Sequence, residues 1–226
     1  MTKKLSLYFV RHGQTYLNKN LRIQGWADTP LTPEGIEVVK ASGRGLADTE
    51  FVAAYSSDLH RTIATAEYIL KENKHGFGLV LEPLSEFRET FFGSLEGEVG
   101  TVAWDKIAKA NGYASKEDLE QRADVRQTMN ATKAADPTGD AEDFMEFWSR
   151  VEKGFLHVIN RHREEGGNIL IVAHGNTIKN IVHELEPSMD PSVVLDNASV
   201  TVLTYENGLF KLDRLNDTSH FQYDEV

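Results

Sequence analysis

The sequence predicts an α/β fold, a three-layer α/β/α sandwich with a mainly parallel central sheet and a helical insertion over the active site. Short apolar runs typical of strands alternate with amphipathic stretches of helical period, which is the pattern of a parallel sheet covered by helices. One run, residues 168–173, is apolar without interruption, as expected of a central strand buried on both faces. The length of 226 residues fits a single domain, 1–226, that carries an insertion.

The first part of the chain predicts three strands and the helices between them. Thr32 followed by Pro33 marks one helix start, because a hydroxyl suits the N-cap and proline suits the first helical position. The expected elements are a strand at 5–10, a short helix within 14–20, a helix at 33–47, a strand at 51–57, a helix at 59–72 and a third strand at 79–81, ended by Pro83.

Residues 98–140 change in character and are rich in alanine, lysine, glutamate and glutamine. We expect two helices there, one around 104–108 and one over 119–132, and interpret the stretch as a lid rather than a separate domain. An aromatic and aliphatic stripe then indicates a core helix. The remaining elements are a helix at 141–165, a strand at 168–173, a helix through 185 and a hairpin of 197–205 and 209–215.

Composition excludes several classes of function. The formal net charge of −11 disfavours partnership with nucleic acid or an anionic membrane. The absence of cysteine excludes disulfides, thiolate nucleophiles and cysteine metal sites. No stretch approaches the roughly 18–20 apolar residues of a membrane span, and the apolar run after Lys4 is too short for a signal peptide. We therefore expect a soluble cytoplasmic protein.

Two predicted strands end in a histidine followed by glycine, at His12 and His174. Ligands of α/β proteins usually bind at the carboxyl ends of the strands. Arg11 directly precedes the first histidine and adds a cation there. Our hypothesis is that His12 is a nucleophile toward phosphorus and that Arg11 holds the phosphoryl oxygens.

Two further segments offer partners for this chemistry. Arg61 lies in the first turn of a helix, where its charge opposes the helix dipole at a cost of a few tenths of a kcal/mol. It is either a solvated surface charge or the partner of an anion bound at that helix N-terminus. The segment 86–97 is predicted to be a loop that presents carboxylates from apolar surroundings, which raise a carboxyl pKa and suit a general acid.

Five motifs in this order resemble the histidine phosphatase superfamily, which includes cofactor-dependent phosphoglycerate mutases and many phosphatases. The resemblance covers most of the chain. Its motifs are Arg11-His12-Gly13-Gln14-Thr15 with Asn18, Gly25-Trp26-Ala27-Asp28-Thr29-Pro30-Leu31-Thr32 with Gly35, Ser57-Asp58-Leu59-His60-Arg61-Thr62 with Thr65-Ala66, Glu89 with Gly93, Glu96 and Gly97, and Val172-Ala173-His174-Gly175.

The resemblance implies a role for each motif residue. His12 would attack phosphorus and carry a phosphohistidine, and Glu89 would be the general acid and base. Glu86 and Glu96 are alternatives for that role. No metal and no cofactor are implied. Arg11, Arg61 and His174 would neutralise the charge of the transferred group, and Asn18, Gln24, Gly25 and Gly175 would complete the phosphate site.

The resemblance leaves hydrolysis and mutase chemistry open, and we favour a metal-independent phosphomonoesterase acting on a small phosphorylated metabolite. The mutases of the family follow the acid with Tyr-Gly and a Leu-Asn-Lys-like stretch, and they carry an arginine pair in the insertion. This chain has Phe92-Gly93-Ser94-Leu95-Glu96-Gly97 and no adjacent arginines. The alternatives are a cofactor-dependent phosphoglycerate mutase and a phosphate-binding protein without catalysis.

The physiological substrate and the oligomeric state cannot be read from the sequence. The insertion contains four cations, which either bind a second anionic group of the substrate or are ordinary helix-surface charges. They are Lys106, Lys109, Arg122 and Arg126.

Overall fold

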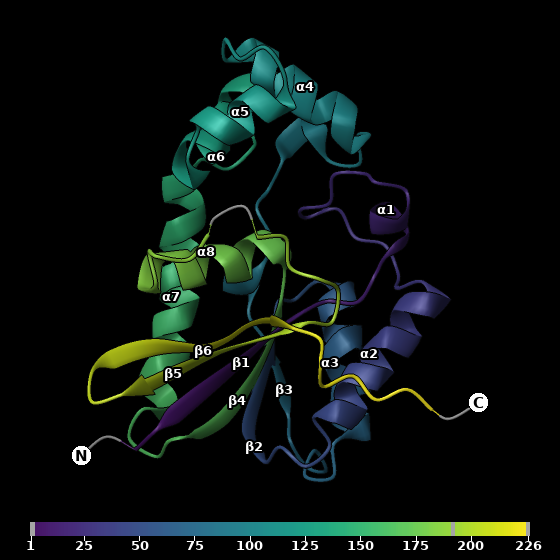
Figure 1. Ribbon diagram of the computed structural model, residues 1–226, viewed down its shortest axis with the longest axis vertical. Coiled ribbons are helices and arrows are strands. Elements are labelled where there is room, and N and C mark those ends of the chain that lie inside the picture. Colours follow the sequence, from purple (N-terminus) through teal and green to yellow (C-terminus); the bar gives the residue numbers. More distant parts are fainter. Residues whose placement is uncertain (1–2, 191–192, 225–226) are drawn as a thin grey trace.

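The computed structural model describes residues 3–190 and 193–224 and contains a six-stranded sheet in the order β3-β2-β4-β1-β5-β6 (Figure 1). Strands β1 to β4 are parallel, and β5 and β6 continue the sheet as an antiparallel hairpin. The predicted α/β class is thus confirmed. The strands are β1 (Leu5–Arg11), β2 (Phe51–Ser56), β3 (Leu81–Pro83), β4 (Gly167–Ala173), β5 (Val200–Glu206) and β6 (Leu209–Asp217).

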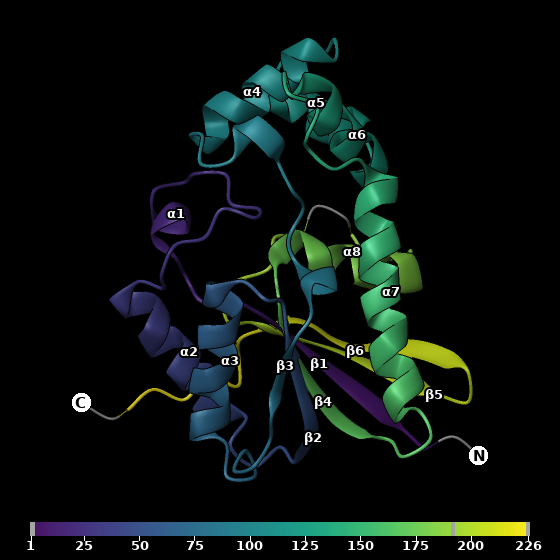
Figure 2. The ribbon, with the colours of Figure 1, turned by 180° about the vertical axis from the view of Figure 1, so that it is seen from behind.

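Helices cover both faces of the sheet, and the alternation of β1 explains why. Phe9 points into a core shared with α7 and α8, whereas Val10 points into one shared with α2 and α3. Figure 2 shows the two helix pairs on opposite sides. None of the helices in the described ranges is long and apolar enough to cross a membrane. The α-helices are α1 (Tyr16–Lys19), α2 (Pro33–Gly45), α3 (His60–Glu72), α4 (Gly100–Ala110), α5 (Lys116–Arg122), α6 (Val125–Ala135), α7 (Phe144–His162) and α8 (Gly175–Leu185), and two 3₁₀ turns lie at Ser85–Phe87 and Gly93–Leu95.

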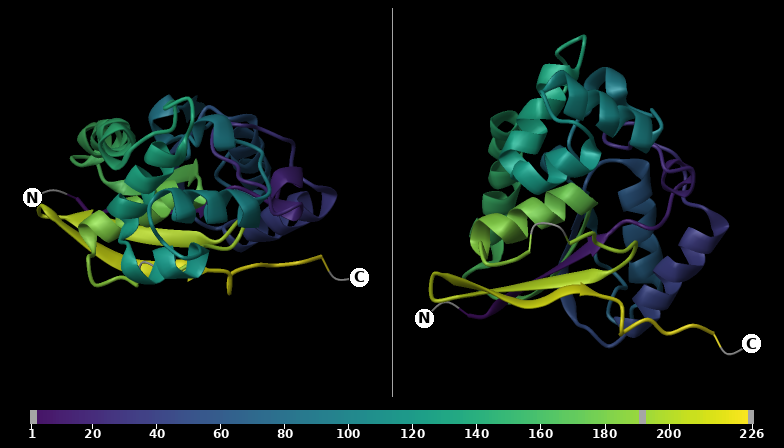
Figure 3. Two further views of the ribbon diagram at one scale, coloured as in Figure 1. Left: turned by 90° about the horizontal axis from the view of Figure 1, so that it is seen from above. Right: turned by 45° about the horizontal axis from the view of Figure 1, so that its top comes forward.

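The insertion forms a cap of three helices, α4 to α6, beyond α8 and the carboxyl ends of the parallel strands (Figures 1 and 3). The cap has an apolar cluster of its own, separate from the two cores of the sheet. Ile107 and Leu119 are fully buried in it, and Ile23 and Phe92 join it from the loops below. The cap is therefore packed onto the loops that follow β1 and precede α4.

Several predicted boundaries were wrong, for local reasons. The helix expected over 119–132 is two helices, because the Asp124 side chain accepts a hydrogen bond from the Gln127 N–H and starts α6 anew. The third strand lies at Leu81–Pro83 rather than 79–81, and proline is tolerated there because β3 is an edge strand. Asp143 caps α7, which begins later than expected.

One buried carboxylate joins the two ends of the cap. Asp136 accepts hydrogen bonds from the backbone N–H of Ala141 (2.9 Å) and from the hydroxyl of Thr138 (3.1 Å). It also accepts from the hydroxyl and N–H of Ser94, which precedes the cap in the chain. Asp136 therefore links the segment that enters the cap to the one that leaves it.

We predict that Asp136→Ala lowers the free energy of unfolding by about 1–3 kcal/mol, because it leaves buried donors without an acceptor. Urea denaturation followed by circular dichroism measures the change. Asp140→Ala is the matched control, because Asp140 is exposed and only four residues away. Equal stability of the two variants would show that Asp136 does not hold the cap.

Candidate active site

The site lies where β1 and β4 end side by side in the sheet. Arg11 pairs with Ala173 in register, so the next residue of each strand is a histidine. The rings of His12 and His174 lie 5.2 Å apart, centroid to centroid. The sheet thus brings together two histidines that are 162 positions apart in the chain.

His12 is held as a neutral imidazole with one nitrogen free to react. Its side chain is buried, with 4% of the residue exposed, and its Nδ1 lies 2.8 Å from the Gly13 carbonyl oxygen. A carbonyl only accepts hydrogen bonds, so Nδ1 carries the proton and Nε2 has the lone pair. Burial, followed by the charges of Arg61 and Arg11, lowers the pKa of His12 well below its usual value.

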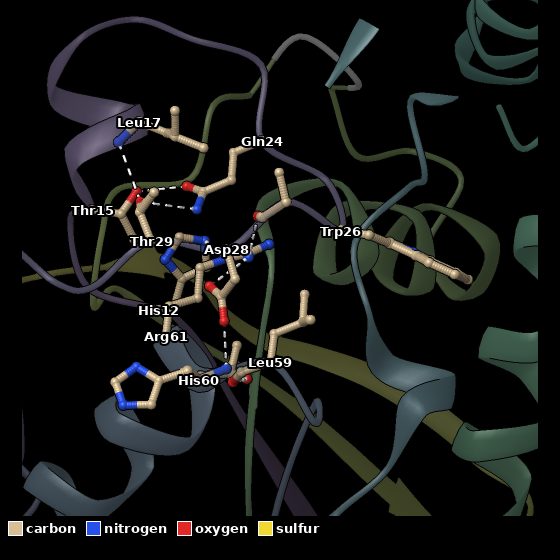
Figure 4. A network of polar contacts seen from close by, with 12 residues as sticks. His12, Thr15, Leu17, Gln24, Trp26, Asp28, Thr29, Leu59, His60 and Arg61 are labelled. Atoms are coloured by element: carbon tan, nitrogen blue, oxygen red, sulfur yellow. Dashed lines mark hydrogen bonds and ion pairs between the residues drawn. The ribbon is translucent and has the colours of Figure 1, made fainter. Parts of the chain in front are cut away.

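Arg61 is completely buried, which excludes its interpretation as a solvated surface charge. Its guanidinium donates to the Asp28 carboxylate and the Ala27 carbonyl, each at 3.0 Å, and to the Gly25 carbonyl at 2.6 Å. Its Nε donates to His12 Nε2 at 3.3 Å. The segment 25–28 therefore aims Arg61 at His12 Nε2, as Figure 4 shows for Asp28 and Arg61.

Asp28 also offsets the cost of a cation at a helix N-terminus. Its second carboxylate oxygen accepts the His60 N–H at 2.6 Å, at the first residue of α3 (Figure 4). A carboxylate at that position is stabilised by the helix dipole that would otherwise disfavour Arg61. One aspartate thus serves both the arginine and the helix that carries it.

His174 is neutral as well, and both of its ring nitrogens have partners. Nδ1 accepts a hydrogen bond from Arg61 at 3.0 Å, so the proton is on Nε2, which donates to the Ser57 hydroxyl at 2.8 Å. Ser57 is bonded in turn to the Thr62 hydroxyl at 2.7 Å. Burial and the charge of Arg61 lower the pKa of His174 well below its usual value. The positive charge of the site therefore comes from its arginines.

Glu89 is the buried carboxyl group of the site, with 6% of the residue exposed. Its carboxylate accepts the N–H groups of Thr90 (2.9 Å) and Asn176 (3.0 Å). Burial raises its pKa, although these two hydrogen bonds and the nearby arginines oppose the rise. Glu86, by contrast, points to Lys153, 3.1 Å away.

Glu96 has a different task from Glu89. Its two carboxylate oxygens accept four backbone N–H groups, from Gly25 (3.0 Å), Trp26 (2.9 Å), Ala27 (3.0 Å) and Phe92 (3.1 Å). A carboxylate whose lone pairs are all engaged in this way is poorly placed to exchange protons with a substrate. Glu96 anchors the segment that aims Arg61.

Three of the predicted phosphate-binding residues lie in the segment between β1 and α2, Asn18 within α1. Asn18 accepts the Thr15 N–H at 3.2 Å and thereby closes the N-terminus of α1. Gln24 accepts the Thr15 hydroxyl at 2.5 Å and approaches Thr29 at 3.4 Å, as Figure 4 shows. At Gly25 only glycine fits, because a Cβ would lie 2.1 Å from the Thr90 carbonyl oxygen.

Arg11 borders a cavity of about 180 Å³. Its guanidinium donates to the Leu195 carbonyl, while its buried Nε has no partner among the described residues. Burial lowers the pKa of Arg11, opposed mainly by the charge of Glu89. Gly175 begins α8, and a Cβ there would lie 3.5 Å from Arg11 Nε. The cavity is lined by Arg11, Glu89, Gly175, Asn176, Lys179, Val193, Val194 and Leu195.

Two residues that hold the backbone of the site were not predicted from the sequence. Arg150 on α7 donates to the carbonyls of Arg88 and Glu89, both at 2.7 Å, and so fixes the backbone of the segment 86–97 around Glu89. The only sign of this role in the sequence is the position of Arg150 next to the aromatic stripe of α7. Asn197 donates to the His12 carbonyl at 2.8 Å across 185 positions, and nothing local in the sequence indicates that contact. Among the described residues, no three His, Asp or Glu side chains converge in a metal-binding cluster.

Comparison with known proteins places the chain among enzymes that act on phosphate esters. The family model "Histidine phosphatase superfamily (branch 1)" matches residues 7–218. A 2,3-bisphosphoglycerate-dependent phosphoglycerate mutase of Methanococcus vannielii is 27% identical over 229 residues, which cover 93% of this chain and 95% of that protein.

Two solved structures show the same fold. A phosphoglycerate mutase from Bacillus anthracis superposes with a TM-score of 0.92 at 38% identity and covers 97% of this chain and 96% of its own. A mycobacterial glucosyl-3-phosphoglycerate phosphatase, solved as a complex with VO3, has a TM-score of 0.73 at 26% identity, with coverage of 94% and 98%. The neighbours of this fold thus include both a mutase and a phosphatase.

We predict that Glu96→Gln lowers kcat/KM for a phosphate ester by about 10- to 100-fold, because an amide replaces two of the acceptor sites that hold segment 25–27. The value of kcat/KM is measured by steady-state kinetics over a range of pH. Glu98→Gln is the matched control, since Glu98 pairs with Lys106 at the surface. A lost alkaline limb of the pH profile in Glu96→Gln would instead make Glu96 the proton donor.

Proposed function

We propose that this chain, which belongs to the histidine phosphatase superfamily (branch 1), is a metal-independent phosphomonoesterase that acts on small phosphorylated substrates through a phosphohistidine on His12. The observation that carries the proposal is the state of His12. It is buried and neutral, with its proton held on Nδ1 by Gly13 and its Nε2 lone pair directed at Arg61. Such an imidazole is nucleophilic near neutral pH without a separate base.

In the first step His12 Nε2 forms a bond to phosphorus while the ester P–O bond breaks. Glu89 gives its proton to the departing oxygen, and its raised pKa favours the protonated form that this step needs. In the second step the Glu89 carboxylate takes a proton from water, and the water oxygen attacks phosphorus. The N–P bond breaks, its electron pair returns to His12, and inorganic phosphate leaves.

Arg11 and Arg61 supply the charge that stabilises the transferred group. The Nε of Arg11 has no partner in the described part of the chain, and the Nε of Arg61 has only the 3.3 Å contact with His12. A phosphoryl oxygen can accept from both without breaking a shorter bond. His174 holds Arg61 in place through the hydrogen bond that its Nδ1 accepts. Asn18, Gln24, Gly25 and Gly175 are the proposed neutral contacts of the phosphate.

The cations of the cap give no specific support to mutase chemistry. A mutase must hold a reoriented phosphorylated intermediate, which calls for cations free to bind its second anionic group. The four cations named for this stretch are each in an ion pair with a carboxylate. The pairs are Lys106–Glu98 (2.7 Å), Lys109–Asp105 (4.0 Å), Arg122–Asp118 (3.0 Å) and Arg126–Glu184 (2.8 Å).

Phosphoglycerate mutase activity is the second candidate, and the names of two relatives favour it. The Methanococcus vannielii protein and the Bacillus anthracis structure both carry that name. Against it stands Phe92, which is buried in the apolar cluster of the cap and offers no hydroxyl to a ligand. In either case the cap, residues 98–140, is proposed to act as a lid over the site.

We predict that His12→Ala loses at least about 1,000-fold in phosphate release and all acid-labile phosphate labelling, because the covalent intermediate cannot form. Phosphate release from a generic ester is measured in the presence of a chelator. His157→Ala is the control, because His157 is exposed and pairs with Glu82. A protein that only binds phosphate esters would show no turnover in the wild type and keep its ligand affinity in His12→Ala. Phosphoglycerate interconversion faster than hydrolysis would identify a mutase.

We predict that Glu89→Gln removes the alkaline limb of the pH–kcat profile and lowers kcat by about 100- to 10,000-fold. Activity requires neutral His12 and protonated Glu89. The lowered pKa of His12 preserves activity toward acid, and activity falls as pH rises through the raised pKa of Glu89.

The leaving group provides a second measurement of Glu89. The burst of p-nitrophenolate should be affected less than release of an alkyl alcohol, because nitrophenolate departs without a proton. Glu86→Gln is the control, since Glu86 pairs with Lys153. Equal losses for both leaving groups would contradict a proton-donating role for Glu89.

A further inference from the structure

The cavity beside Glu89 lies on the side where the leaving group must depart. A general acid has to reach the oxygen that it protonates, so the alcohol is released next to the Glu89 carboxyl. Glu89 lines the cavity of about 180 Å³ together with Arg11 and Lys179. This volume is below the roughly 300–1,000 Å³ of pockets for drug-sized ligands, which indicates a small leaving group.

Lys179 is a cation in this cavity without an ion pair. It lies on α8 one turn beyond Gly175 and on the same face, since residues four apart in a helix are neighbours. It is half-buried, and within the ranges that the structure describes its side chain makes neither an ion pair nor a hydrogen bond. Burial lowers its pKa, opposed by the charges of Glu89 and of Glu120 in the cap. An anion that enters the cavity would stabilise the charged form of Lys179.

The other cations around the site are already engaged. Those of the cap are paired with carboxylates, as described above. Arg88 makes a bidentate pair with Asp58 at 2.6 and 2.7 Å, and Arg150 pairs with Glu142 at 2.6 Å. Lys179 is thus the cation that a second charge of the substrate would meet at the least cost.

We propose that Lys179 binds a second anionic group on the leaving side of the substrate, so that the preferred substrates are small phosphate monoesters with a carboxylate or a second phosphate a few bonds from the ester oxygen. This inference rests on the proposed function, because it takes Glu89 as the donor to the leaving group. In this arrangement Arg11 and Arg61 bind the phosphoryl group, and Lys179 binds the second anion in the cavity that it lines together with Arg11.

The test compares esters that differ in one group. 3-Phosphoglycerate and glycerol 3-phosphate share a three-carbon chain and differ in a carboxylate against a hydroxymethyl group. Propane-1,3-diol bisphosphate and its monophosphate form the corresponding phosphate pair. The quantity measured is the ratio of kcat/KM for the anionic ester to that for its uncharged partner.

In Lys179→Met this ratio should fall by about 10- to 100-fold, the range for losing a hydrogen bond between charged groups. Lys179→Arg should retain most of it. Lys109→Met is the matched control, because it removes the same charge from an exposed residue of the cap and should leave the ratio unchanged. A fall in the carboxylate pair alone assigns a carboxylate, and a fall in the bisphosphate pair alone assigns a phosphate.

Two outcomes overturn the proposal. One is an unchanged ratio in Lys179→Met for both pairs. The other is an equal loss for charged and uncharged esters with a shifted alkaline limb, which would mean that Lys179 acts only through its field on Glu89. The proposed function fails separately, when wild type hydrolyses none of the esters. Calorimetry then still tests the anion site. The affinities for inorganic phosphate, glycolate and 2-phosphoglycolate are compared between wild type and Lys179→Met.

Discussion

The structure of the site depends on the burial of one guanidinium group. A charge removed from water costs several kcal/mol unless it is paired and hydrogen-bonded. Arg61 meets this condition through Asp28, which also stabilises the start of α3, and through two carbonyls of the preceding loop. Its remaining donors reach His12 and His174. The arginine, the two histidines and the loop therefore form one unit, in which none can move without leaving a buried polar group unpaired.

Around this unit the protein uses backbone atoms as much as side chains. Glu96 collects four N–H groups and shapes the loop whose carbonyls then accept from Arg61. Arg150 has the converse role in the loop that carries Glu89, because its guanidinium donates to the carbonyls of Arg88 and Glu89. The two charges are thus dispersed over peptide groups, and the backbone segments around Arg61 and Glu89 are held by these hydrogen bonds. Such preorganisation suits a site in which chemistry depends on position.

The opposite pKa shifts of His12 and Glu89 have a common origin in burial. Loss of water disfavours the charged form of each, so the pKa of His12 falls and that of Glu89 rises. Both shifts favour the forms that the proposed nucleophilic attack and proton donation require. Burial also lowers the pKa of Lys179. Burial of the site therefore favours the neutral form of all three groups.

The sequence by itself determined the α/β class, the core stripe of α7 and the set of residues that meet at the strand ends. Those features are local: the hydrophobic period, the turn residues, and a histidine and glycine at the end of two apolar runs. Helix boundaries within the cap were missed, because capping by Asp124 competes with a continuous apolar pattern. Only the tertiary structure could separate Glu89 from Glu96, or show that Arg61 is buried and Lys179 unpaired. These distinctions depend on which groups surround a side chain in space, and the partners lie tens to hundreds of positions away in the chain.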